Sequence, residues 1–151
     1  MANVWVIVEE PTGEIYRNLL ELAQTRCSTF SLTRRYGLNF GQSAKLISKS
    51  LADYLIEEVE SKSWAGTTVG KGLGIVRKYQ ITPASIQVLA DASGLYSWMH
   101  PKRPEDLSFY LPDNNTWLWS TAHEGEAFIE DAKLTFEKIH QAVPGLQLKE
   151  R

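Results

Sequence analysis

The chain has 151 residues, of which 43% are hydrophobic and 23% are charged, and its formal net charge is −2. This length and composition are typical of a folded domain rather than a disordered tail, so we expect one domain over residues 1–151. The slight negative charge argues against nucleic acid as the main partner, because phosphate binding needs a concentrated basic face. The single cysteine excludes an intrachain disulfide and a zinc site built from several cysteines.

The N-terminal segment MANVWVIVEEP does not have the features of a signal peptide, because it lacks a basic start and its apolar run is short. No other stretch approaches the run of about 18 apolar residues that would span a bilayer. We therefore expect a cytoplasmic protein without a membrane partner.

The first half of the chain predicts two strands and two helices. Residues 4–8 are β-branched or aromatic and predict a buried strand. A helix of about twelve residues follows from Thr12, and an imperfect alternation over 28–35 predicts a second strand. Apolar residues spaced by three and four over 42–61 predict one long amphipathic helix.

The second half predicts a strand over 73–81 and a helix over 82–94. A hairpin follows, with strands over 107–111 and 117–122, and a last helix is predicted over 126–141. Thr82 followed by a proline is a favourable helix start, since threonine caps the first turn and proline fits the first helical position. The resulting order is β-α-β-α-β-α-β-β-α. It predicts an α+β domain of two layers, with about five strands in a mixed or mainly antiparallel sheet and four helices.

The glycine-rich segment over 66–74 invites comparison with a phosphate-binding loop. Its glycine spacing is one residue short, and it precedes a strand rather than the helix whose dipole would hold phosphate. We therefore predict a loop without a nucleotide.

The segment over 94–126 concentrates aromatic side chains, with three of the five tryptophans. Trp117 and Trp119 are expected to share one face of a strand, because alternate strand residues point the same way. Tryptophan and tyrosine beside arginine are typical of interface hot spots and of pockets that stack planar ligands, although tryptophans also fill cores. The candidate binding residues are Tyr96, Trp98, Arg103, Tyr110, Trp117 and Trp119.

His123 and Glu124 stand where the last predicted strand meets the last predicted helix. Glu105 and Asp106 precede the partner strand and are expected near His123 if the hairpin has a simple register. A histidine with carboxylates can act as a general base or as half of a metal site, so an enzyme would use His123, Glu124 and Asp106. The same residues can simply start a helix, since acidic residues favour its N-terminus. The histidine spacing contains no metal motif, so we predict no metal and no other cofactor.

The run RPEDLSFYLPDNNTWLWSTAHEGEAFI combines PEDL, two aromatic residues, a short turn, a tryptophan-containing strand and the pattern S-x-A-H-E. It resembles a group of small bacterial proteins that have no established activity. The opening VWVIVEEPTGEIYRNLLELA is similar to that group as well. The resemblance implies a bacterial or phage origin and one self-standing domain, and it implies no catalytic residues.

The leading functional hypothesis is a non-enzymatic, cytoplasmic binding protein that engages a protein partner through the surface over 94–126. An immunity or inhibitor protein of a bacterial or phage conflict system would have this character. The alternative is a protein that binds or hydrolyses a small, nucleotide-like ligand, with His123 at the polar end of an aromatic pocket. The sequence leaves the oligomeric state open.

Overall fold

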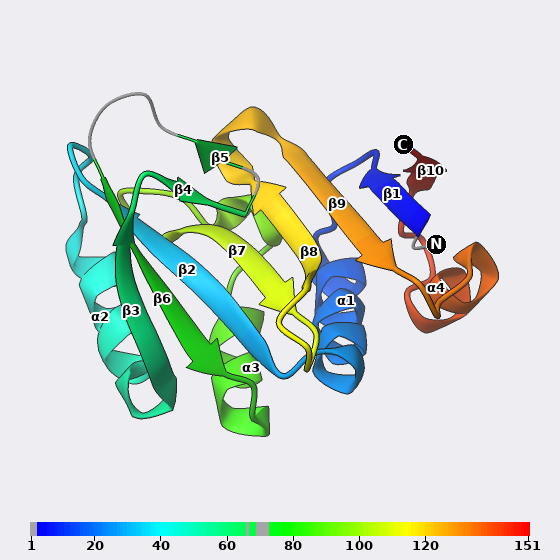
Figure 1. The fold of residues 1–151 in the computed structure, drawn as a ribbon, viewed down its shortest axis with the longest axis horizontal. Helices are drawn as coiled ribbons and strands as arrows, with labels where there is room; N and C mark the ends of the chain where they lie inside the picture. Colours follow the sequence, from blue (N-terminus) through cyan, green and yellow to red (C-terminus); the bar gives the residue numbers. More distant parts are fainter. Residues whose placement is uncertain (1–2, 66, 69–72) are drawn as a thin grey trace.

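The computed structural model describes residues 3–65, 67–68 and 73–151. It is an α+β fold built on one eight-stranded sheet in the order β10-β1-β9-β8-β7-β2-β6-β3, in which every neighbouring pair is antiparallel (Figure 1). A separate ribbon joins β4 to β5. The strands in chain order are β1 (Asn3–Ile7), β2 (Thr29–Arg35), β3 (Leu55–Ser61), β4 (Ser63–Trp64), β5 (Thr67–Thr68), β6 (Gly74–Gln80), β7 (Glu105–Tyr110), β8 (Thr116–Thr121), β9 (Glu126–Asp131) and β10 (Leu148–Glu150).

The helices of the described residues lie mainly on one face of this sheet, and the β4–β5 ribbon covers part of the other face (Figure 1). They are α1 (Gly13–Arg26), α2 (Gln42–Ser50), α3 (Pro83–Ala90) and α4 (Phe136–Ala142), with short 3₁₀ turns η1 (Ala52–Tyr54), η2 (Leu95–Ser97) and η3 (Ala122–Glu124). None of them combines the length and the apolar character that crossing a bilayer would require.

The description as two layers with about five strands is wrong, and one cause is the helix predicted over 42–61. The helix ends at Ser50, and residues 55–61 form β3, which pairs with β6 from Leu55 opposite Tyr79 onward. The apolar residues over 42–61 are spaced by three and four, as in a helix. Residues 55–61 nevertheless pair with β6, and this pairing supplies backbone hydrogen bonds that the last turn of a helix would lack. Tertiary pairing therefore overrides the local pattern.

The second cause is the helix predicted over 126–141. Its first part is β9, a strand that is hydrogen-bonded to β8 on one side and to β1 on the other. Ala127, Ile129 and Asp131 are buried while the residues between them are more exposed, which is the period of two that defines a strand. The helix α4 begins only after Thr135, whose hydroxyl accepts a hydrogen bond from the backbone of Lys138.

Other local predictions are confirmed. The Thr82 side chain accepts a hydrogen bond from the Ser85 backbone, and the Ser85 hydroxyl accepts one from the Thr82 backbone. This reciprocal cap, with Pro83 in the first turn, starts α3. The strand over 28–35 and the hairpin of β7 and β8 also form close to their predicted bounds.

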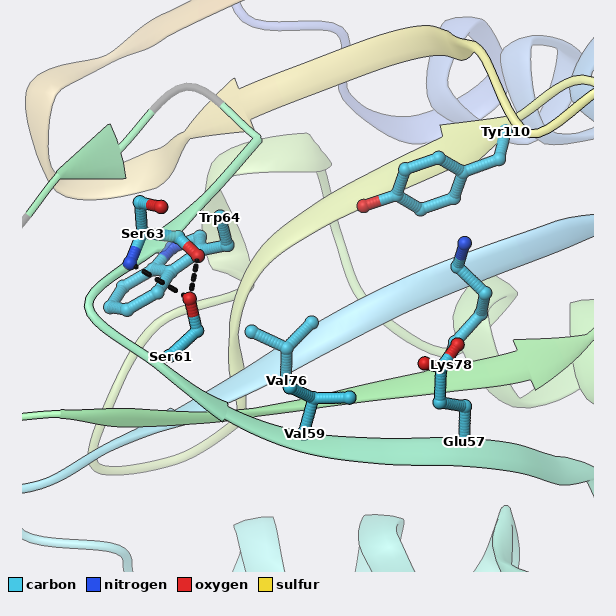
Figure 2. Close-up of a pocket in the computed structure, with 8 residues that line it drawn as sticks. All are labelled: Glu57, Val59, Ser61, Ser63, Trp64, Val76, Lys78 and Tyr110. Carbon is cyan, nitrogen blue, oxygen red and sulfur yellow. Dashed lines mark hydrogen bonds between the residues drawn. The ribbon is translucent and has the colours of Figure 1, made fainter.

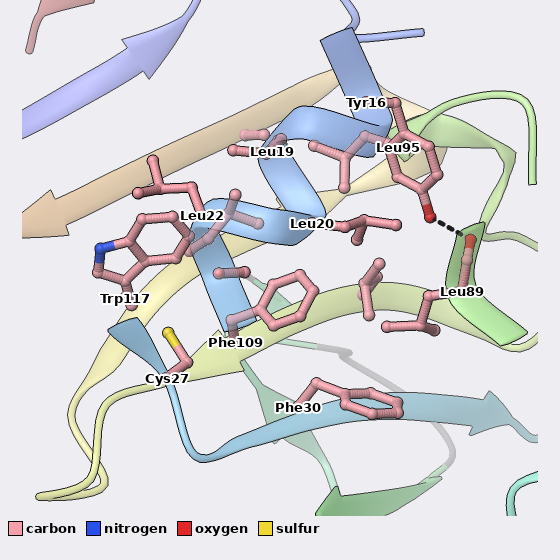
Figure 3. Packing of buried hydrophobic residues seen from close by; sticks show 14 of the residues in the cluster. Tyr16, Leu19, Leu20, Leu22, Cys27, Phe30, Leu89, Leu95, Phe109 and Trp117 are labelled. Atoms are coloured by element: carbon pink, nitrogen blue, oxygen red, sulfur yellow. Dashed lines mark hydrogen bonds between the residues drawn. The ribbon is translucent and has the colours of Figure 1, made fainter. Parts of the chain in front are cut away.

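The hydrophobic core lies between the sheet and helices α1 and α3. Figure 3 shows Leu19 and Leu20 of α1 above Phe30 of β2 and Phe109 of β7, and all four side chains are buried. The Phe30 and Phe109 rings lie 6.1 Å apart between centroids, so neighbouring strands contribute to one continuous cluster. Burial of this apolar surface is the main force that holds the helices on the sheet.

Candidate functional site

The two most prominent aromatic candidates are part of the core. Trp98 and Trp117 are completely buried. The indole nitrogen of Trp98 donates to the Tyr16 hydroxyl at 2.9 Å, and that of Trp117 donates to Oδ2 of Asp131 at 2.8 Å. Neither ring can contact a partner from these positions, so the reading of these tryptophans as core residues holds.

The expectation that Trp117 and Trp119 share one face of the strand is wrong. A β-bulge between β7 and β8 pairs Phe109 with Leu118 and Tyr110 with Thr116, which leaves Trp117 as an extra residue. Trp117 and Leu118 therefore both enter the core. Trp119 is only partly buried and stacks on Phe128 with ring centroids 5.3 Å apart.

The remaining candidates lie in different surroundings, so the six do not form one exposed patch. Tyr96 is half-buried and its backbone donates to Oε2 of Glu10, whereas the Tyr110 hydroxyl lies 2.8 Å from that of Ser31. The Arg103 guanidinium stands 5.8 Å from the centre of the Trp98 ring. A binding role for these residues stays a prediction.

The charged candidates converge at one end of the central hairpin. Because β7 and β8 are antiparallel, the start of β7 lies beside the end of β8, where η3 carries His123. One ligand atom each of Glu105, Asp106 and His123 lies within 4.8 Å of the others. The expected closeness is confirmed, and we call these three residues the carboxylate–histidine cluster. Glu124 is exposed and lies outside it.

Glu105 is one of the two buried members of this cluster, with a side chain that is 3% exposed. Its Oε1 lies 3.3 Å from Nδ1 of His100, and its Oε2 lies 4.0 Å from Nδ1 of His123. Burial alone would raise the pKa of Glu105, but the two histidines outweigh it and lower the pKa below its usual value. The carboxyl is therefore held in its charged form.

His100 is a residue that sequence reasoning missed, because nothing in its spacing connects it with His123. Its side chain is 3% exposed, and its Nε2 accepts a hydrogen bond from the backbone of Arg35 at 3.2 Å. That bond leaves Nδ1 facing Oε1 of Glu105. The hydrogen bond from Arg35 depends on β2 lying beside β7 in the sheet, which no local pattern reveals.

Asp106 adopts an uncommon backbone conformation with φ of 60°. Its Oδ2 accepts hydrogen bonds from Nε1 of Trp64 at 2.9 Å and from the Thr67 hydroxyl at 3.3 Å, and its Oδ1 accepts one from the backbone of Ala122 at 3.0 Å. Positive φ at a residue other than glycine costs of order 1–3 kcal/mol and persists only where the surroundings impose it. Burial, with the nearby charge of Glu105, raises the pKa of Asp106 despite these donors.

Trp64 reaches Asp106 because the strand beneath it begins with a glycine. A Cβ atom at Gly74 would lie 2.6 Å from the Trp64 ring and 2.9 Å from the Thr33 side chain, so a larger residue would displace the indole. The sequence offered no signal for this contact, since Trp64 and Asp106 are far apart in the chain.

A second candidate site lies at the far edge of the sheet, in a segment that the sequence assigned to a helix. The strand β3 ends the sheet order, and no described strand pairs with its outer side. Leu55, Ile56 and Val59 are 42%, 57% and 43% exposed. Glu57, Glu58 and Glu60 are exposed on the same strand. We call β3 with these side chains the acidic edge strand.

A cavity of about 220 Å³ lies beside the acidic edge strand, on the sheet face that the ribbon covers. Figure 2 shows it between Val59 and Val76 on the sheet and the rings of Trp64 and Tyr110. The ammonium of Lys78 stands 4.1 Å from the centre of the Tyr110 ring. The cavity is lined by Glu57, Val59, Ser61, Ser63, Trp64, Val76, Lys78 and Tyr110.

Comparison of the chain with protein-family models, with curated proteins and with solved structures returned no match.

Proposed function

We propose that this chain is a non-enzymatic binding protein that takes an extended segment of a protein partner along the acidic edge strand. The observation that carries the proposal is a free strand edge with three exposed apolar side chains. In recognition by strand addition, backbone hydrogen bonds provide affinity and pockets for alternate side chains provide specificity. The cavity beside Val59 is placed to receive one such side chain.

The charge of the edge favours a basic segment. Residues 55–61 carry three glutamates and no lysine or arginine. Glu58 is paired with Arg77, whereas Glu57 lines the cavity. Two copies of this strand would repel each other, because each carries three glutamates. A second copy of the chain is therefore a poorer occupant than a basic partner.

The proposed binding surface lies on β3 and includes little of the segment over 94–126, where the sequence predicted it. Trp98 and Trp117 are buried, and Tyr110 alone of the six candidates lines the cavity. An immunity or inhibitor role in the cytoplasm is the narrower form of the proposal. It is supported by the acidic edge, since proteins that act on nucleic acids present basic surfaces that such an edge would complement.

The test uses two synthetic peptides, one alternating lysine with valine and one alternating glutamate with valine, and measures their affinities by fluorescence anisotropy. We expect the basic peptide to bind the native protein and the acidic peptide not to bind. The variant Val59→Lys should weaken the basic peptide at least about tenfold, or 1.4 kcal/mol, because it places a like charge at the cavity. Val8→Lys is the matched control, since Val8 is 55% exposed and lies outside the cavity.

Equal affinity of the two peptides for the native protein would refute a charge-selected strand site. Equal affinity of the basic peptide for Val59→Lys and for Val8→Lys would show that binding, if present, occurs elsewhere.

The alternative proposal, a small-ligand binding protein or hydrolase with His123 at its polar end, is favoured by the convergence of Glu105, Asp106 and His123. It is the weaker candidate, because His123 does not line the aromatic cavity. Burial also raises the pKa of the Cys27 thiol to about 12, which disfavours a thiolate nucleophile. A thermal-shift screen with nucleotides separates the two proposals, since a ligand at about 100 times its dissociation constant adds about 2.7 kcal/mol of stability.

A further inference from the structure

The carboxylate–histidine cluster brings together two kinds of metal-ligating atom. Oxygen atoms of Glu105 and Asp106 and a nitrogen of His123 lie within 4.8 Å of one another. An imidazole nitrogen with carboxylate oxygens is a donor set that proteins use for first-row transition metals, whereas Mg²⁺ and Ca²⁺ are held by oxygen atoms. The set is therefore chemically different from a simple group of acidic side chains.

An independent observation points to a missing partner at this place. Oε2 of Glu105 is buried and has no hydrogen-bond partner, and the Glu105 side chain is only 3% exposed. An ionised carboxylate that loses water without gaining a partner is costly. Nδ1 of His123 lies 4.0 Å away, too far for a hydrogen bond. A cation between these two atoms would satisfy both.

The surrounding groups orient the carboxylates as the neighbours of metal ligands commonly do. Asp106 accepts hydrogen bonds from Trp64, from Thr67 and from the backbone of Ala122, which fix its plane. The other oxygen of Glu105 lies 3.3 Å from Nδ1 of His100. Asp106 is thus held in place by hydrogen bonds, Glu105 faces His100 on one side only, and each carboxylate retains lone pairs for a ligand.

We propose that Glu105, Asp106 and His123 bind a first-row divalent cation such as Zn²⁺ or Mn²⁺, with the remaining coordination positions open to solvent. The His123 side chain is 38% exposed, which gives the ion a route from solvent. Zinc bonds of about 2.0–2.2 Å place tetrahedral donors roughly 3.3–3.6 Å apart, so the cluster has to contract on binding. His123 can supply that movement, because it lies on a surface turn while the carboxylates are buried.

This proposal is independent of the peptide-binding function. Its test is isothermal titration of the untagged protein with Zn²⁺, with Mn²⁺ and, as a control ion, with Mg²⁺. We expect one equivalent of Zn²⁺ or Mn²⁺ to bind the native protein, and Mg²⁺ to bind far more weakly. His123→Ala should lower the affinity at least tenfold, in the range seen when a metal site is disturbed.

The matched control is His140→Ala, because His140 is also an exposed histidine but lies on α4, away from the cluster. It should leave the affinity unchanged. Glu105→Gln should weaken binding as well, and if that variant does not fold by circular dichroism, the exposed His123 variant still decides the question.

Two results would overturn the metal proposal. One is the absence of stoichiometric Zn²⁺ and Mn²⁺ binding to the native protein, and the other is equal affinity for His123→Ala and His140→Ala. The peptide affinities are measured separately and do not depend on either result. Failure of the metal proposal can therefore be distinguished from failure of the proposed peptide-binding function.

Discussion

The indole nitrogen of Trp98 donates a hydrogen bond to the hydroxyl of Tyr16, which in turn donates to the backbone oxygen of Leu89 at 2.7 Å. This chain of donors joins α1, α3 and the segment after η2 inside the core, where Tyr16 and Trp98 are completely buried. It satisfies the Trp98 nitrogen and the Tyr16 hydroxyl, which would otherwise be buried without partners.

Tyr16→Phe should therefore lower the free energy of unfolding by about 1–3 kcal/mol, because it leaves the buried Trp98 nitrogen unpaired and removes one of the hydrogen bonds that the Leu89 oxygen accepts. The measurement is urea-induced unfolding followed by circular dichroism. Tyr96→Phe is the control, since the Tyr96 hydroxyl is buried without a hydrogen-bond partner and its removal should be neutral or stabilising. A loss of the same size in both variants would contradict the argument.

The tryptophans of β8 should differ in their effect on stability. Trp117→Ala should cost about 3–5 kcal/mol, because it empties a buried site and removes the hydrogen bond to Asp131. Trp119→Ala should cost clearly less, since that ring is partly exposed and mainly stacks on Phe128. Urea-induced unfolding of the two variants measures the difference, and similar losses would show that Trp117 is not a core residue.

Asp131 should make the protein sensitive to acid. Burial, the largest single influence, would raise the pKa of this carboxyl, but donors led by Arg26 outweigh it and lower the pKa below its usual value. Since the folded pKa lies below the unfolded value of about 3.9, the stabilisation is complete above that pH. It is lost as the pH falls through the folded value.

The measurement is the urea midpoint as a function of pH from about 6 to about 2. Asp131→Asn should be less stable than the native protein at neutral pH, by about 3 kcal/mol, because Arg26 loses its bidentate partner. Its stability should decline less steeply in acid. If the stability of Asp131→Asn declines as steeply in acid as that of the native protein, the acid sensitivity comes from groups other than Asp131.

The glutamates of the acidic edge strand should keep the protein from associating with itself. Replacing Glu57 and Glu60 together by valine should produce concentration-dependent association in sedimentation velocity, because an apolar strand edge pairs readily with another. The control makes the same charge change at Glu14 and Glu21, which are exposed on α1 rather than on a strand. Association of both variants to the same extent would attribute the effect to net charge.

The sequence predicted elements whose signals are local. Thr82 with its proline defines a helix start within a few residues, and the loop between the strands of the hairpin is marked by turn residues. The segments 55–61 and 126–131 were misassigned because their apolar spacing fits two periods. Their state is decided by β6, β8 and β1, which are distant in the chain.

The candidate site divides in the same way. The closeness of Glu105 and Asp106 to His123 follows from the hairpin alone, so it was predictable. The contact of Trp64 with the cluster depends on the ribbon, and the bond from Arg35 to His100 depends on β2 lying beside β7, so no spacing in the sequence encodes them. The bulge that buries Trp117 is equally invisible in the sequence, because alternation assumes an unbroken ladder.

Trp64 belongs to both sites, since its ring lines the cavity beside β3 and its nitrogen holds the carboxylate of Asp106. A cation bound as proposed would draw charge from Asp106 and so change the hydrogen bond that orients this ring at the cavity wall. Occupation of the two proposed sites would then be thermodynamically linked: the factor by which the ion changes the peptide affinity would equal the factor by which the peptide changes the ion affinity.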